Sequence, residues 1–337
     1  MKFGVFFLTT ILLYSCTQKL EINPVSETFY QSSMRGLFLV NDTTIFSSGT
    51  KGIIGLSSDI FGLKKITKND DWKSLDFRDI HAFSEKEVVI MSAGDGCEIY
   101  KSNDGQKSWN LVYENHNKGI FFDGMDFWDN KNGLAFSDPI DNQLFIIETN
   151  DGGNSWHNLK SYKLPKTLKG EAGFAASGTG IDCVGDSTVY IGTGGAEVSR
   201  IFISNDRGKN WRVVDTPMRS GEASGIYSLT FIDKLNGILV GGNYIDSANT
   251  KGNCAITSDG GLTWKLPKTP PIGYMSCVTH NDYGMALCTG RKGTDISYDQ
   301  GINWEHISDE SYYSCVLSNT SGWLTGREGK MAKLIFK

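Results

Sequence analysis

Residues 204–211 read Ser204-Asn205-Asp206-Arg207-Gly208-Lys209-Asn210-Trp211, and four other segments repeat the pattern of Ser or Thr, any residue, Asp, one or two Gly and Trp. In such a turn the aspartate accepts hydrogen bonds from backbone amides, glycine supplies a positive φ, and tryptophan packs beneath the turn. The pattern predicts five equivalent hairpin turns with structural Asp and Trp residues. These residues are Asp104 and Trp109, Asp151 and Trp156, Asp206 and Trp211, Asp259 and Trp264, and Asp299 and Trp304.

The five aspartates recur about every 40 to 55 residues, a spacing that indicates a repeat architecture. Apolar stretches beside each turn, such as Gly225 to Ile232, predict four strands per repeat. We therefore predict an all-β, seven-bladed β-propeller of four-stranded antiparallel blades, forming one domain over residues 16–337. The first strands of the blades are expected near Arg35, Arg78, Gly124, Phe174, Gly225, Met275 and Tyr313.

The first and last blades depart from the repeat. Blade one has only a degenerate turn at Asn69 to Trp72, and blade seven has none. The chain after Tyr313 is long enough for three strands only. A strand within residues 19–29 is expected to supply the fourth, which closes the ring and removes its open edge. Because a closed ring has no edge that demands a partner, we expect a monomer.

The repeated turns resemble those of Asp-box proteins, also called bacterial neuraminidase repeat proteins, whose known members are β-propellers. The resemblance implies the same fold and the same turn structure for this chain.

The N-terminal residues indicate export. Lys2 precedes an apolar run from Phe3 to Leu13, which is too short to span a bilayer, and Ser15-Cys16 follows it. The segment resembles a bacterial lipoprotein signal peptide, which implies removal of residues 1–15 and lipidation of Cys16. An ordinary cleaved signal peptide is the alternative, and both interpretations export the protein. We expect a lipoprotein anchored to a membrane of a bacterial cell envelope.

Composition excludes several classes of protein. The net charge of -5 argues against nucleic-acid binding. The other six cysteines show no CxxC spacing and the five histidines are scattered, so no metal site is expected. Buried thiols are the favoured interpretation. Export to an oxidising compartment would also allow a disulfide, for which Cys277 and Cys288, on adjacent strands, are the favoured pair.

Binding residues are expected on the propeller face opposite the Asp turns, around the central funnel. Several guanidinium groups in one funnel would form a receptor for anions or carboxylates. The candidate binding residues are Arg35, Arg78, Arg200, Tyr244, Arg291 and Arg327.

Enzymatic alternatives have weaker support. Sialidases share the Asp boxes, but Arg35 is followed by Gly36-Leu37 where they carry Ile-Pro. A glycosidase needs two facing carboxylates, for which Asp138 and Glu171 are the candidates. Gly192 to Gly195 lacks the third glycine and the helix of a dinucleotide-binding loop, and no cofactor is expected.

A second resemblance covers nearly the whole of residues 16–337. Its motifs are Arg35-Gly36-Leu37, Phe77 to Ile80, Asp138-Pro139, Gly170 to Thr179, and Gly241 to Tyr244. They look like a propeller family related to photosystem II stability/assembly factors, whose members are non-catalytic and bind membrane-protein precursors through an arginine patch. This resemblance implies an assembly scaffold that binds a membrane or envelope protein, with Arg35, Arg78 and Arg200 in the patch. A carbohydrate-active or glycan-binding propeller is the alternative.

Overall fold

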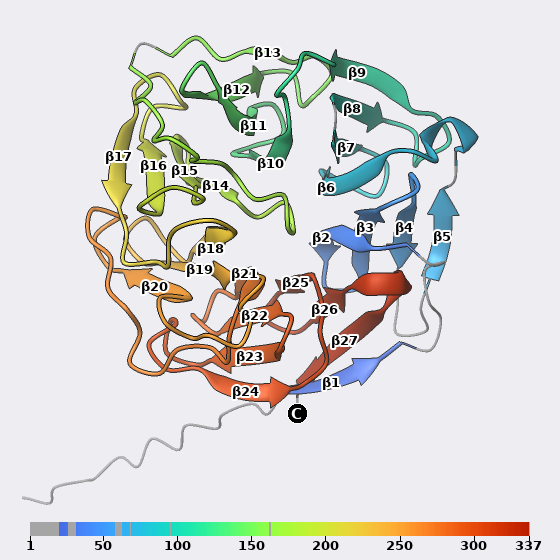
Figure 1. Cartoon of the computed structure of the whole chain (residues 1–337). Helices are drawn as coiled ribbons and strands as arrows, with labels where there is room; N and C mark the ends of the chain where they lie inside the picture. The colour runs from blue at the N-terminus through green and yellow to red at the C-terminus, as the bar shows by residue number, and fades with distance from the viewer. Residues whose placement is uncertain are drawn as a thin grey trace, which may run out of the picture.

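Seven β-sheets surround a central axis in the computed structural model, which describes residues 20–25, 32–57, 63–67, 69–94, 96–161 and 163–336 (Figure 1). The middle strands of the blades are mostly apolar and lie buried between neighbouring sheets, as in β7 (Val88–Ala93) and β16 (Arg200–Ser204). The predicted all-β, seven-bladed propeller is confirmed. Within the described residues, no helix is long and apolar enough to cross a membrane.

Blades one to four each contain four antiparallel strands. Blade one consists of β2 (Met34–Asn41), β3 (Thr44–Gly49), β4 (Ile54–Ser57) and β5 (Leu63–Thr67). Blade two consists of β6 (Asp76–Ala82), β7, β8 (Cys97–Ser102) and β9 (Asn110–Asn115). Blade three consists of β10 (Phe122–Phe127), β11 (Gly133–Ile140), β12 (Gln143–Thr149) and β13 (His157–Asn158). Blade four consists of β14 (Ile181–Val184), β15 (Thr188–Gly192), β16 and β17 (Arg212–Asp215).

Blade five is the exception to the four-stranded pattern. It consists of β18 (Ser224–Phe231), β19 (Gly237–Asn243) and β20 (Cys254–Thr257), and a single bridge between Ile256 and Lys265 takes the fourth place. Blade six consists of β21 (Met275–His280), β22 (Ala286–Gly290), β23 (Gly293–Ser297) and β24 (Glu305–Ser308). Blade seven consists of β25 (Ser314–Leu317), β26 (Gly322–Thr325), β27 (Met331–Phe336) and the N-terminal β1 (Leu20–Pro24). β1 pairs with β27, so the predicted ring closure is confirmed.

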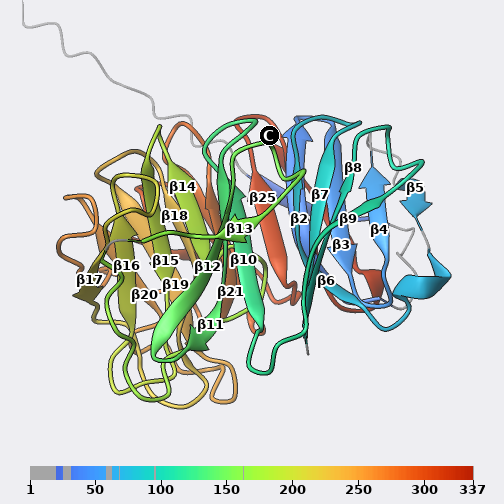
Figure 2. The same cartoon turned by 90° about the horizontal axis from the view of Figure 1, so that it is seen from above.

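The five repeated turns join the third and fourth strands of blades two to six and share one hydrogen-bond pattern. In blade three, Asp151 Oδ1 accepts from the Thr149 hydroxyl at 2.9 Å and from Ser155 N at 3.0 Å. We call the face that carries these turns the Asp-turn face. Seen from the side, the strands run between this face and the opposite one, and the C-terminal end of the chain lies at one face (Figure 2).

Hydrogen bonds between the innermost strands of adjacent blades tie the ring together. Asp79 accepts from Met125 N, Asp126 from Cys183 N and Asp182 from Phe231 N, each at 2.7 Å. Burial raises the pKa of Asp126 to about 6, and burial with the nearby Asp126 raises that of Asp182 to about 8.

Three expectations need correction. Asn69 to Trp72 is no Asp turn: Asp70–Trp72 forms a short 3-10 helix (η1) after the fourth strand, with Trp72 buried. The first strand of blade four begins at Ile181, beyond Phe174, because the chain before it crosses the ring. Cys277 and Cys288 are free thiols. Val278 is the residue opposite Cys288, so Cys277 points to the other side of the sheet.

Candidate functional site

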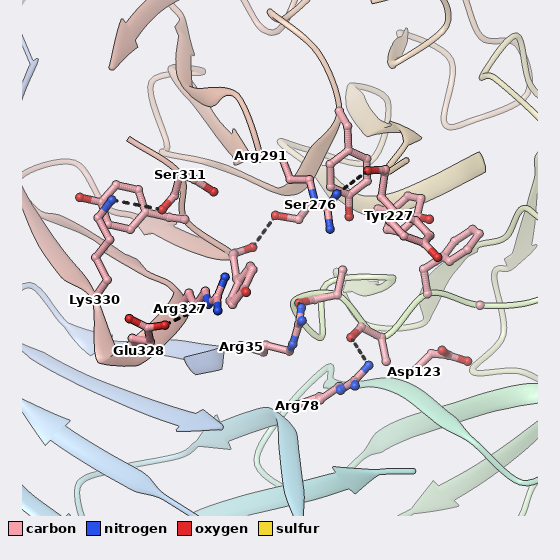
Figure 3. Close-up of a pocket in the computed structure, with 18 of the residues that line it drawn as sticks. Arg35, Arg78, Asp123, Tyr227, Ser276, Arg291, Ser311, Arg327, Glu328 and Lys330 are labelled. Atoms are coloured by element: carbon pink, nitrogen blue, oxygen red, sulfur yellow. Dashed lines mark hydrogen bonds and ion pairs between the residues drawn. The ribbon is translucent and has the colours of Figure 1, made fainter. Parts of the chain in front are cut away.

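A hollow of about 830 Å³ opens at the centre of the ring, on the face opposite the Asp turns (Figure 3). Six of the seven blades and the segment that leads into blade four line the hollow, because each first strand begins at this end of the axis. We call this opening the central hollow. Its lining includes four arginines, one lysine, two acids and seven aromatic residues. They are Arg35, Arg78, Arg291, Arg327, Lys330, Asp123, Glu328, Phe121, Phe174, Tyr227, Tyr244, Tyr274, Tyr312 and Tyr313.

Residues 172–179 form the floor of the central hollow. This segment pairs with blade four through a bridge between Ala172 and Gly194 and then reaches blade six, where the Ser177 hydroxyl donates to Ser276 O at 2.8 Å. Gly173 N donates to Asp138 Oδ1 at 2.9 Å, which fixes the start of the segment to blade three. The floor is therefore held from several sides of the ring.

Two of the arginines are attached to this floor. Arg35 Nη1 donates to Ala176 O at 3.1 Å, and Arg78 Nη1 donates to Ala175 O at 3.2 Å. Arg78 Nε also pairs with Asp76 at 2.8 Å, and the Arg35 guanidinium lies 4.2 Å from the centre of the Tyr313 ring. Burial, and then the charge of Arg78, lowers the pKa of Arg35. Both side chains thus have a structural task as well as a charge.

The other cations lie nearer the rim. Arg291 Nη1 donates to Tyr244 O at 2.9 Å, and its guanidinium lies 5.5 Å from the Tyr244 ring centre. Arg327 is 76% exposed and pairs with Glu328 at 3.2 Å. Lys330 pairs with Glu310. Five cationic side chains and two carboxyl groups line the hollow, and Asp76 and Glu310 pair with two of the cations from outside the lining. Cations therefore outnumber carboxyl groups here, although the chain as a whole is acidic.

One of the two carboxyl groups in the lining is buried, which favours its neutral form. Asp123 is 1% exposed, and neither of its oxygens has a hydrogen-bond partner. Burial, and then the charge of Asp138, raises its pKa well above the usual value, against the opposing effect of Arg78. The neutral form adds no negative charge to the wall.

Aromatic rings form one side of the hollow. The rings of Phe174 and Tyr227 stack with centres 3.9 Å apart, and Tyr274 meets Tyr227 edge-on at 4.8 Å. Tyr244 is 41% exposed at the rim. Such a wall offers apolar contact area and hydroxyl groups beside the cations.

The structure brings together five of the six candidate binding residues: Arg35, Arg78, Tyr244, Arg291 and Arg327. Arg200 is separate from them, and the expected position of this residue is corrected. Its side chain is 8% exposed and forms a buried ion pair with Glu171. Arg200 Nε donates to Glu171 Oε1 at 3.0 Å, and Nη2 donates to Lys166 O at 3.0 Å.

The two candidate catalytic carboxylates also lie outside the lining of the hollow. Glu171 is occupied by Arg200 and by the Thr193 hydroxyl, and Asp138 holds the floor. Burial raises the pKa of Asp138 to about 6. In the described part of the chain, no group of three or more His, Cys, Asp or Glu residues is placed to hold a metal ion. Cys16 lies outside the described residues.

Sequence reasoning missed most of the aromatic wall. Phe121, Tyr274 and Tyr313 each stand directly before the first strand of their blade, and this shared position is a signal that the sequence did contain. Asp123 gave no such signal, because its burial depends on residues 172–179 folding over it.

Two solved structures have the same arrangement of blades. The structure of "YCF48 bound to D1 peptide" superposes with a TM-score of 0.65 at 11% identity, over 94% of this chain and 96% of that one. The protein shares its fold with YCF48. YCF48 from Cyanidioschyzon merolae matches with a TM-score of 0.66 at 12% identity, over 93% and 98% of the two chains. Neither a family model nor a curated protein matches the sequence.

Proposed function

We propose that this protein is an exported, lipid-anchored, non-catalytic scaffold of the cell envelope that binds a partner protein in its central hollow. The observation that carries the proposal is the composition of the hollow, where cations and aromatic rings from six blades and from the floor surround one opening. Forked guanidinium groups beside aromatic rings suit an anionic segment of polypeptide. One protein of the same fold was solved with a bound peptide.

Anchoring is proposed from the sequence of residues 1–16, whose apolar run and Cys16 match a lipoprotein signal. A lipid on Cys16 would confine the propeller to a membrane surface and so raise its local concentration near membrane partners.

Glycan hydrolysis is the less favoured function. A hydrolase needs a pair of carboxylates facing the substrate, but Glu171 is bound to Arg200, and Asp138 supports the floor. Of the acids in the hollow, Asp123 is buried and Glu328 is paired with Arg327.

The test places a photo-crosslinking amino acid at Tyr244, which is exposed at the rim, in cells that produce the full chain. Arg291→Glu and Arg327→Glu are preferred to changes of Arg35 and Arg78, which hold the floor. The expected result is one major crosslinked protein that both variants lose. Arg212→Glu, an exposed arginine on the outer strand of blade four, is the matched control and should keep the crosslink. Equal crosslinking by all variants would overturn the proposal.

A further inference from the structure

The pairing of β1 fixes the face at which the N-terminal end joins the ring. Leu20 lies opposite Phe336, and Pro24 lies opposite Ala332. β27 starts directly after the turn at Arg327–Gly329, in which Arg327 and Glu328 line the hollow, so its other end lies at the Asp-turn face. In blades two to six, that end of the third strand carries the Asp turn. Leu20 is therefore at the Asp-turn face.

The distance from Cys16 to this point is short. Leu20 is four residues after Cys16, and four extended residues span at most about 14 Å. β1 itself covers about 13 Å between Leu20 and Pro24, so a chain turned back along β1 would use its whole reach before it passed the hollow rim. A lipid on Cys16 therefore holds the Asp-turn side of blade seven close to the bilayer.

Of the five Asp turns, all of which belong to the described residues, only those of blades five and six have an apolar tip. The residue after the second Gly position of each turn is Lys107, Asn154 and Lys209 in blades two to four, but Leu262 and Ile302 in blades five and six. Leu262 is 54% exposed and Ile302 is 42% exposed.

The turns between first and second strands follow the same division. A backbone carbonyl there accepts from the Asp turn of the same blade. It belongs to Lys86, Lys131 and Ser187 in blades two to four, to Leu235 in blade five and to Gly284, the neighbour of Tyr283, in blade six. Leu235 is 56% exposed, and Tyr283 in the corresponding turn of blade six is 79% exposed. Among blades two to six, the apolar tips thus lie on blades five and six, and blade six adjoins blade seven.

We propose that these tips (Leu235, Leu262, Tyr283 and Ile302) rest on the bilayer that carries the lipid of Cys16, so that the central hollow opens away from that membrane. The inference rests on the lipid anchor of the proposed function. Apolar side chains beside a lipid anchor enter the interfacial region and add contact area, and they fix which face of the ring meets the lipid. The hollow is then free to receive a soluble segment of its partner.

The test uses the full lipidated chain in vesicles of phosphatidylethanolamine and phosphatidylglycerol. Leu262→Cys, Ile302→Cys and Arg327→Cys are labelled in the folded state with an environment-sensitive fluorophore, since five of the other six thiols are buried and the sixth is partly buried. Lipids carrying a quencher on the acyl chain are then added. Lys107→Cys, at the same turn position in blade two, is the matched control.

Labels at Leu262 and Ile302 are expected to lose fluorescence, with a smaller loss at Lys107 and no loss at Arg327. Equal quenching at Arg327 and Leu262, or quenching at neither, would overturn the orientation. The mass of the N-terminal peptide is measured on the same sample. A Cys16 without lipid would overturn the anchor and the orientation together, whereas the crosslink from Tyr244 tests partner binding independently of both.

Discussion

Glu171 and Arg200 form an ion pair that is almost completely removed from solvent, with side-chain exposures of 0% and 8%. The pair links the start of the floor segment to the third strand of blade four. The ion pair explains why Arg200 lies outside the central hollow, although it is among the candidate binding residues predicted from the sequence.

Removing one partner of this pair should destabilise the fold strongly, because the other charge stays buried. Glu171→Gln and Arg200→Met are each expected to lower the free energy of unfolding by about 3–5 kcal/mol. The measurement is urea unfolding of residues 20–337 followed by tryptophan fluorescence. The double variant Glu171→Leu/Arg200→Met should recover part of the loss. A cost well below 1 kcal/mol for both single variants would contradict the buried pair.

Gly173 is required by a close approach between the floor and the wall. A Cβ on this residue would lie 2.3 Å from Asp123 Oδ2. Gly173→Ala is expected to lower the free energy of unfolding by about 1–3 kcal/mol through overpacking. Asp123→Gly should be less harmful in the Gly173→Ala background than alone, as judged by a double-mutant cycle. Additive costs would show that these residues do not touch.

Stability should fall as pH rises through the range in which Asp126 and Asp182 lose their protons. Their folded-state pKa values, about 6 and about 8, exceed the ordinary unfolded value, so the unfolded chain loses its protons first. The contribution of these two groups to the free energy of unfolding is therefore largest below about pH 4. As the pH rises, this contribution declines by at most about 1.4 kcal/mol per pH unit per group. Asp182→Asn should flatten the decline above pH 6. The exposed control Asp186→Asn should leave it unchanged, and identical slopes for all three proteins would count against the prediction.

The six cysteines of the propeller should all be reduced even after export. Five are buried and Cys183 is partly buried, and each is free in the structure. Alkylation followed by mass measurement should modify few thiols in the folded protein and all six after unfolding without reductant. Two protected thiols after unfolding would indicate a disulfide that this arrangement of side chains does not contain.

The propeller could be predicted because its signal repeats. Each Asp turn marks the connection between the third and fourth strands of one blade, and the apolar runs around it are long enough for only a few strands. Phe174-Ala175-Ala176 has the same apolar character as a first strand, yet it forms the floor. What separates the two outcomes is a set of contacts distant in sequence, such as Arg35 with Ala176, and no local pattern encodes them.

The candidate site was predictable to a similar degree. Arg35, Arg78 and Arg291 could be assigned to one face from the topology of the blades. Arg200 could not be distinguished from these three arginines, because its burial depends on an ion pair with Glu171, 29 residues earlier in the chain. The raised pKa of Asp123 likewise depends on packing that only the folded ring provides.

The pairing of β1 with β27 also has a mechanical consequence. Five residue pairs join β1 to β27, and the N-terminal end of β1, at Leu20, is where the preceding chain is attached to the ring. A pull at that end along the strand axis loads all of these pairs at once in shear, and the strand cannot be peeled away one hydrogen bond at a time. The seam that completes the circle is thus oriented to withstand tension from its own tether.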